Sequence, residues 1–293
     1  MTGGLIDLGG LTKPATILIE KISDAVGGLA KPWQIERLSR AEARSKIIQA
    51  EADIEVSEIE KRAIRRLVSE EGKKQKNIED ISFGAIPLLK EDAKPEDISE
   101  DWISHFFERS RLTSDRQMQA IWSSILAGQA NSPGAFSRKT VDLVATLEQS
   151  DAKLLNKLAK CVIYFGAYDK AGNAVPGEYD PKTIIFDYTD DTGEKYWNFG
   201  ELNHLVNMGF IQCNFERAFG ARGMPGEISF DYGSDSYCMN VGNDFPITIE
   251  IGNVVLTMAG LQLIEVIGRE EDINYFDRIV SFWSGYGYVV SRV

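Results

Sequence analysis

The chain has 293 residues, 43% of them hydrophobic, and a formal net charge of −12 at pH 7. It is long enough for two ordinary domains and apolar enough for a buried core, which excludes wholesale disorder. The acidic charge lies after residue 90, so most of the chain repels phosphate backbones, and nucleic acid is not an expected partner.

The first amphipathic segment follows a glycine-rich start at residues 1–10. Pro14 stands where the first turn of a helix tolerates proline. The apolar stripe that follows comprises Leu18, Ile22, Ala25, Val26 and Leu29. It predicts a helix that docks on the protein's own core or on a neighbouring subunit. A helix lying on a membrane surface is the alternative, which the scarcity of Lys and Arg on the polar face disfavours.

A long charged helix is predicted from about Gln34 to about Asp80, because this stretch contains no proline and only one glycine, Gly72. At about 1.5 Å per residue it would reach roughly 70 Å, which is wider than most cores. An apolar seam recurs along it, formed by Ala41, Ile48, Ala52, Val56, Ile59, Ala63 and Leu67. We expect this seam to hold a homo-oligomer together; a lone solvated helix is the alternative.

The same helix carries a basic run, and an acidic segment follows it. The run comprises Lys61-Arg62, Arg65-Arg66 and residues 73–76, and glutamates flank it on both sides. This mixture favours a solvated face with internal salt bridges over a surface for nucleic acid or lipid. Residues 89–100 are acidic and contain Pro95, which is typical of a linker.

The next stretch, residues 98–158, predicts a compact helical core. Trp102, Ile103, Phe106 and Phe107 share one face of a first helix, and Met118, Ile121, Trp122, Ile125 and Leu126 share one face of a second. Aromatic residues at helical spacing are typical of packing against a core, although Trp102 or Trp122 as a ligand platform is the alternative.

Cap and turn chemistry predicts where these helices begin and end. The predicted boundaries are Ser114 with Gln117 at the start of the second helix, Gly128 at its end, a turn at 131–134, Ser137 at the start of a third helix and Ser150-Asp151 near the start of a fourth.

Several strings in this region resemble a known family. DWISHFF, SDRQMQAIWSSILAG, SPGAFSRKTVDLVATL and DAKLL, with LTKPATILIEKISDAVG, AEARSKI and KQKNIEDI upstream, are similar to the bacterial domain-of-unknown-function family 2806. The resemblance covers residues 10–158 and implies no catalytic residues. A shorter similarity, from SSILAG to DAKLL, is to the abortive-infection alpha family, which implies a setting in defence against phage.

The character of the chain changes after Gly166, where short strands are predicted. Single strands are predicted at residues 183–188, 228–232 and 236–241. A helix that runs into a strand is predicted at 198–215, and a hairpin of two strands at 247–257. Thr257 and Asp272 are predicted to cap two further helices. This order of elements resembles a winged-helix unit over about 150–268, although the candidate reading helix at 198–210 has no Lys or Arg.

The sequence shows no catalytic, cofactor or metal motif. His105 and His204 each lie among apolar neighbours and are predicted to be structural. Cys161, Cys213 and Cys238 are far apart and odd in number, which is typical of free thiols in a reducing cytosol. The glycine-rich run at 219–226 lacks a following helix, so we expect a surface loop there.

Together these patterns predict a mainly α protein with a smaller α+β C-terminal domain. The predicted parts are an amphipathic start (1–33), a long helix and linker (34–96), a helical core module (97–150) and a winged-helix-like domain (151–293). We expect a cytoplasmic, non-enzymatic, self-assembling interaction protein with a protein or phage-protein partner and no cofactor. A membrane-acting effector and a winged-helix nucleic-acid binder are the alternatives.

Overall fold

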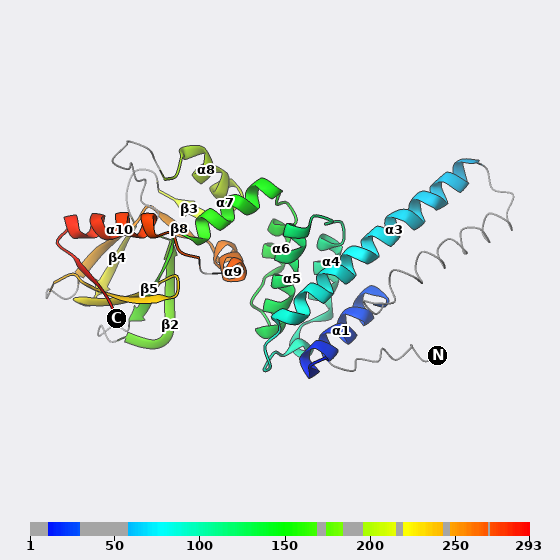
Figure 1. Ribbon diagram of the computed structural model, residues 1–293, viewed down its shortest axis with the longest axis horizontal. Coiled ribbons are helices and arrows are strands. Elements are labelled where there is room, and N and C mark those ends of the chain that lie inside the picture. The colour runs from blue at the N-terminus through cyan, green and yellow to red at the C-terminus, as the bar shows by residue number, and fades with distance from the viewer. Residues whose placement is uncertain are drawn as a thin grey trace. The chain divides into compact units, whose positions relative to one another are not determined.

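The structure, a computed structural model, describes residues 11–29, 58–168, 174–183, 196–214, 219–242, 247–268 and 270–293. The chain forms two units, Met1–Ala145 and Thr146–Val293. The described part of the first unit is helical, and the second combines helices with antiparallel strands (Figure 1). This confirms the predicted mainly α fold with an α+β C-terminal part. The finer division at residues 33 and 96 stays a prediction.

The helical unit is built from these described elements: α1 (Lys13–Val26), α3 (Glu58–Ala85), the short 3-10 helices η1 (Ile86–Leu88) and η2 (Pro95–Asp97), α4 (Glu100–Ser110), α5 (Arg116–Asn131) and α6 (Arg138–Val144). Residues 34–57 of the predicted long helix lie outside the described residues. From Glu58 onward the helix is continuous and extends past Asp80 to Ala85.

Large aromatic side chains fill the core of this unit, as their spacing predicts. Trp102 stacks on Phe106 with ring centroids 5.1 Å apart, and Phe106 meets Trp122 edge to face at 5.2 Å. Trp122 is fully buried, and the indole Nε1 of Trp102 donates to the carbonyl of Phe136 at 2.8 Å. Both indoles therefore pack inside the protein, which favours the packing interpretation over a ligand platform.

Two predicted boundaries of α5 are wrong. Asp115, and not Ser114, is the N-cap, because its carboxylate accepts from the backbone N–H groups of Gln117 and Met118. Gly128 does not end the helix, which continues to Asn131. A Cβ at Gly128 would lie 2.7 Å from the ring of Phe136, so the glycine makes room for this ring. The predicted Ser137 cap of α6 is confirmed.

The acidic segment between α3 and α4 is held within the helical unit. The backbone N–H of Lys94 donates to Ala130 at 2.8 Å, and that of Lys90 donates to the Asn131 side chain at 2.9 Å. The ammonium group of Lys21 on α1 binds the carbonyl of Ile98 at 2.6 Å. This segment therefore connects two helices of one unit and is tied to both α1 and α5.

The second unit contains these described elements: α7 (Gln149–Ala159), β1 (Val162–Tyr168), β2 (Ala174–Thr183), α8 (Phe199–Asn207), β3 (Ile211–Cys213), β4 (Phe219–Met224), β5 (Glu227–Tyr232), β6 (Asp235–Asn240), β7 (Ile247–Gly252), β8 (Val254–Leu256), α9 (Met258–Ile267), α10 (Ile273–Gly285) and β9 (Val289–Arg292). Five strands form an antiparallel sheet in the order β2-β1-β5-β6-β9. Helix α10 packs on it through Phe276 and Trp283, which contact Phe230.

The strands predicted at 228–232 and 236–241 are confirmed as β5 and β6, and the caps at Thr257 and Asp272 are confirmed. The predicted hairpin at 247–257 is wrong, because β7 pairs with β4 and β8 pairs with β3. The surface loop expected at 219–226 is also wrong, since residues 219–224 form β4, whose glycines coincide with irregular register. The prediction of a winged-helix unit has no support in this topology, because β5 and β6 belong to a five-stranded sheet that also contains β9.

Candidate functional site

A groove with a volume of about 850 Å³ lies in the helical unit, between α3, the α4–α5 connection and α5. Its walls carry five cations, Lys73, Lys74, Lys76, Arg111 and Arg116, and two carboxylates, Glu70 and Asp80. The groove is therefore locally positive in a chain whose net charge is −12. This volume is in the range of sites that bind small molecules.

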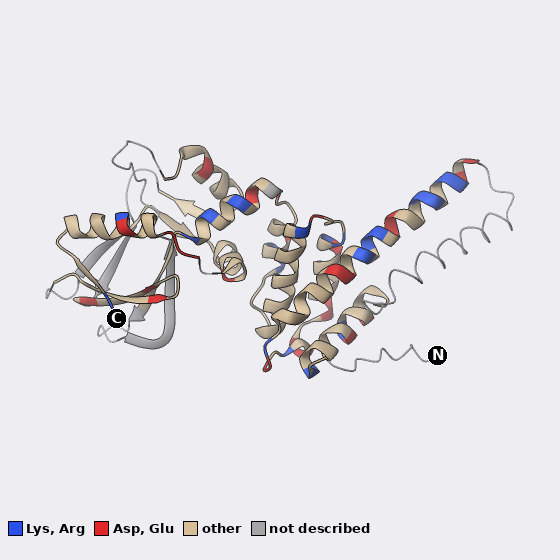
Figure 2. Ribbon diagram, in the orientation of Figure 1, with Lys and Arg blue, Asp and Glu red and all other residues tan. Residues whose placement is uncertain are grey.

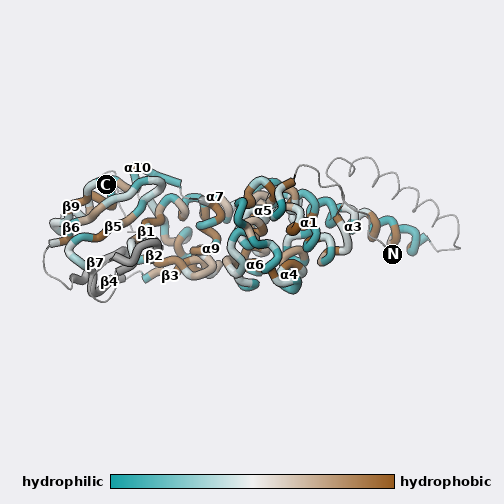
Figure 3. The backbone as a smooth tube through the Cα atoms, turned by 90° about the horizontal axis from the view of Figure 1, so that it is seen from below, coloured by the Kyte–Doolittle hydropathy of each residue, from teal (hydrophilic) through white to brown (hydrophobic). Residues whose placement is uncertain are grey.

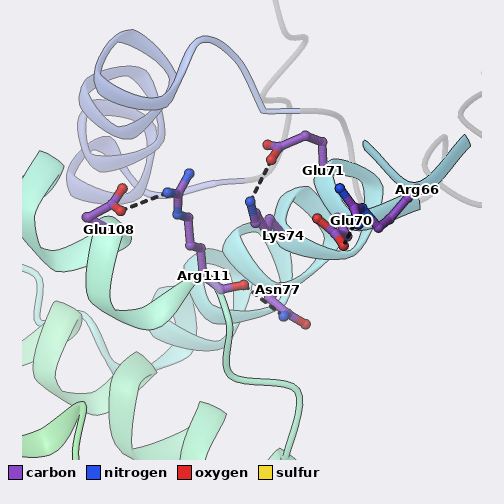
Figure 4. A network of polar contacts seen from close by, with 7 residues as sticks. All are labelled: Arg66, Glu70, Glu71, Lys74, Asn77, Glu108 and Arg111. Carbon is purple, nitrogen blue, oxygen red and sulfur yellow. Dashed lines mark hydrogen bonds and ion pairs between the residues drawn. The ribbon is translucent and has the colours of Figure 1, made fainter. Parts of the chain in front are cut away.

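Several of the groove's charges already have partners (Figure 4). Lys74 binds Glu71 at 2.6 Å, Arg111 binds Glu108 at 2.7 Å, and Lys76 pairs with Asp80. The Lys74 ammonium donates to the Glu71 carboxylate and lowers its pKa. By contrast, Lys73 and Arg116 have no ion-pair partner in the part of the chain that the structure describes.

Hydrogen bonds fix the two walls of the groove relative to each other. The side-chain amide of the buried Asn77 donates to the carbonyl of Arg111 at 2.9 Å and accepts from Gln119 at 3.2 Å. The hydroxyl of Ser123 donates to the carbonyl of Ile81 at 2.9 Å. A Cβ at Gly84 would lie 2.4 Å from the Ser123 hydroxyl, so α3 and α5 approach closely there.

One family model matches a region that contains the groove and parts of both units. The model is described as a protein of unknown function (DUF2806), and it covers residues 61–280 of the 293. The chain belongs to the DUF2806 family. No curated protein and no solved structure matches this DUF2806 chain significantly.

The seam predicted on the long helix of this DUF2806 chain is uncovered where the structure describes it. Ile59 is 70% exposed and Leu67 is 57% exposed, and Ala63 between them is also exposed. Ala41, Ile48, Ala52 and Val56 lie outside the described residues. Hydrophobic and hydrophilic positions alternate along these outer turns of α3 (Figure 3). A stripe of exposed apolar side chains one helical turn apart, unlike single exposed ones, is typical of a surface that pairs with another chain.

The apolar face of α1 is covered by the protein's own helical unit. Leu18 and Ile22 are fully buried and Leu29 is 8% exposed, whereas Val26 is half-buried. The helix packs against α4 and η2. Among the described residues, no helix is both long enough and apolar enough to cross a membrane.

Both histidines of the DUF2806 chain lie beside a carboxylate of a neighbouring helix. Nε2 of His105 on α4 is 3.0 Å from Asp142 on α6, and Nε2 of His204 on α8 is 2.7 Å from Asp151 on α7. Asp151 also accepts from the backbone N–H of Glu148 and so caps its own helix. Each histidine therefore lies between two helices, and its structural role stays a prediction.

The buried cysteine of the second unit lies in an environment that suppresses thiol chemistry. Cys161 is fully buried, and burial raises the pKa of its thiol to about 12. Its surroundings include Tyr196, whose hydroxyl donates to Asp272 at 2.8 Å. A nucleophile needs the opposite shift, because the thiolate is the reactive form.

We expect Cys161 to resist alkylation in the native protein at pH 8. With its pKa near 12, the thiolate fraction is on the order of a thousandfold below that of an ordinary thiol. Iodoacetamide labelling followed by mass spectrometry measures the three cysteines separately. Cys213 and Cys238, which are half-buried, should label first, and all three should label in guanidinium. Native labelling of Cys161 at the rate of Cys238 would contradict this.

Proposed function

We propose that this DUF2806 protein is a non-enzymatic, cytoplasmic interaction protein that self-associates through the exposed seam of α3. The observation that carries the proposal is the exposure of Ile59 and Leu67 on a helix with a repeating apolar stripe. Burying such side chains against a second copy would remove apolar surface from water. The three free cysteines fit a reducing compartment.

The surroundings of the seam support pairing with a like surface. Lys61 pairs with Glu58 at 3.3 Å and Arg66 with Glu70 at 3.7 Å, and short blocks of cations and carboxylates follow one another along α3 (Figure 2). Along α3 as a whole, seven cations accompany six carboxylates. A nearly neutral face that carries both signs of charge can lie against the same face of a second copy without strong repulsion.

Two other functions find less support in the geometry. A membrane-acting effector would have to withdraw Leu18 and Ile22 from the core that buries them. A nucleic-acid binder would need free cations on α8, whose Glu201 instead pairs with Lys157 at 2.8 Å. The similarity of residues 123–155 to the abortive-infection alpha family supports phage defence as the setting of the proposed association.

The test is the mass of the full chain in solution, measured by light scattering at micromolar concentration. We expect the wild type to be an oligomer and the double variant Ile59→Asp, Leu67→Asp to have at most half its mass, because two carboxylates would be buried in the seam. The matched control is Met258→Asp with Ile273→Asp. These residues are 71% and 69% exposed at the first turns of α9 and α10, where acidic side chains are tolerated.

The control variant should keep the wild-type mass. A wild type that is monomeric at micromolar concentration, or a seam variant with unchanged mass, would show that α3 does not hold an assembly together.

A further inference from the structure

We propose that the groove between α3 and α5 binds a small molecule that carries several phosphate groups. The site comprises Lys73 and Arg116 on opposite walls, with Arg111 and Lys76 beside them. This binding activity is separate from self-association, because the exposed seam residues Ile59, Ala63 and Leu67 are not among those that line the groove.

The charges of the groove favour an anion. Five cations and two carboxylates line it, whereas α3 taken as a whole carries seven cations and six carboxylates. The α3 residues of the groove contribute three cations and two carboxylates, so the rest of the excess comes from Arg111 and Arg116. Because Lys73 and Arg116 have no ion-pair partner among the described residues, an incoming anion need not displace a carboxylate from either of them. Phosphate oxygens accept charge-assisted hydrogen bonds from such groups.

The walls that hold these cations are fixed before a ligand arrives. Asn77 ties α3 to the carbonyl of Arg111, and Gln119 ties α5 to both Asn77 and the carbonyl of Thr113 at 3.0 Å. The α4–α5 connection is therefore anchored at Arg111 and at Thr113. A preformed site loses less conformational entropy on binding than one that must first be ordered.

The size and lining of the groove favour a small molecule over a nucleic-acid strand. Its volume of about 850 Å³ suits a nucleotide-sized ligand. Leu112 and Ala120 add apolar surface to the lining, where the organic part of a ligand can pack. Duplex DNA needs many phosphate contacts along an extended surface, and the acidic residues along α3 oppose this.

Calorimetric titration of the full chain tests the proposal. The probes are adenosine triphosphate, inorganic tripolyphosphate, adenosine and a short DNA duplex, in buffer without magnesium because Mg²⁺ neutralises phosphates. We expect both polyphosphates to bind, adenosine not to bind, and the polyphosphate affinity to fall as salt is raised. Lys73→Glu with Arg116→Glu should weaken polyphosphate binding by about tenfold or more.

Two further variants make the test specific. Lys90→Glu with Lys139→Glu changes the same number of charges at exposed sites outside the groove and should bind polyphosphate like the wild type. Lys73→Gln with Arg116→Gln removes the cations without adding repulsion and should also lose affinity. The proposal is overturned if neither polyphosphate binds at millimolar concentration, if the groove variants bind as tightly as the wild type, or if DNA binds more tightly than adenosine triphosphate.

Discussion

Replacing Trp122 with alanine should lower the free energy of unfolding of the helical unit by about 3–5 kcal/mol. The indole is fully buried and meets the ring of Phe106 edge to face at 5.2 Å. Its Nε1 donates to the hydroxyl of Thr113 at 3.1 Å. Alanine would leave a large cavity and remove this hydrogen bond, and close-packed neighbours relax only partly into such a cavity.

Urea unfolding monitored by circular dichroism measures this loss. Leu112→Ala is the control, because Leu112 is 71% exposed and exposed substitutions change stability by about 0.5 kcal/mol or less. An unchanged unfolding midpoint for Trp122→Ala, together with a lost cellular activity, would show that Trp122 serves function and not packing.

The second large effect is expected at Gly260 in α9. A Cβ there would lie 2.0 Å from the carbonyl oxygen of Phe210, which is backbone and cannot rotate away. That oxygen also accepts from the backbone N–H of Thr257 at 2.9 Å, so its position is fixed by the cap of α9. Gly260→Ala should therefore destabilise the second unit by about 1–3 kcal/mol, as overpacking does.

Helix propensity acts in the opposite direction at this site but is the smaller effect. Alanine stabilises a helix interior relative to glycine by at most about 1 kcal/mol, and a 2.0 Å approach forces α9 to shift. Gly285→Ala in α10 is the control, because a Cβ there meets nothing within 4 Å. Thermal unfolding of both variants makes the comparison. Equal or higher stability of Gly260→Ala would mean that α9 does not pack against Phe210 as described.

Local patterns predicted the helical core well. Trp102 and Phe106 lie four residues apart on α4, Trp122 belongs to the apolar face of α5, and all three are buried together. The exact caps were harder to predict, because Ser114 and Asp115 are adjacent residues that can each cap a helix. The carboxylate of Asp115 is the group that reaches the free N–H groups of α5.

Pairing partners in the second unit could not be predicted from local patterns. The turn-like Gly252-Asn253 between β7 and β8 favours a hairpin, yet each of these strands pairs with a strand earlier in the chain. The groove was missed for a similar reason. Neighbouring glutamates balance the basic run at 73–76 in the sequence, whereas Arg111 and Arg116 join it only through the fold.

The pairing of β3 with β8 also bears on how the second unit forms. Ile211 and Leu256 become neighbours only after the whole intervening chain, including β4 to β7, has been brought back on itself. The helical unit contains contacts of similar or longer range, because Ser123 on α5 donates to Ile81 on α3 and α1 packs against α4. Because closing long loops costs entropy before any contact compensates, neither unit is expected to form before most of its own chain has been brought together.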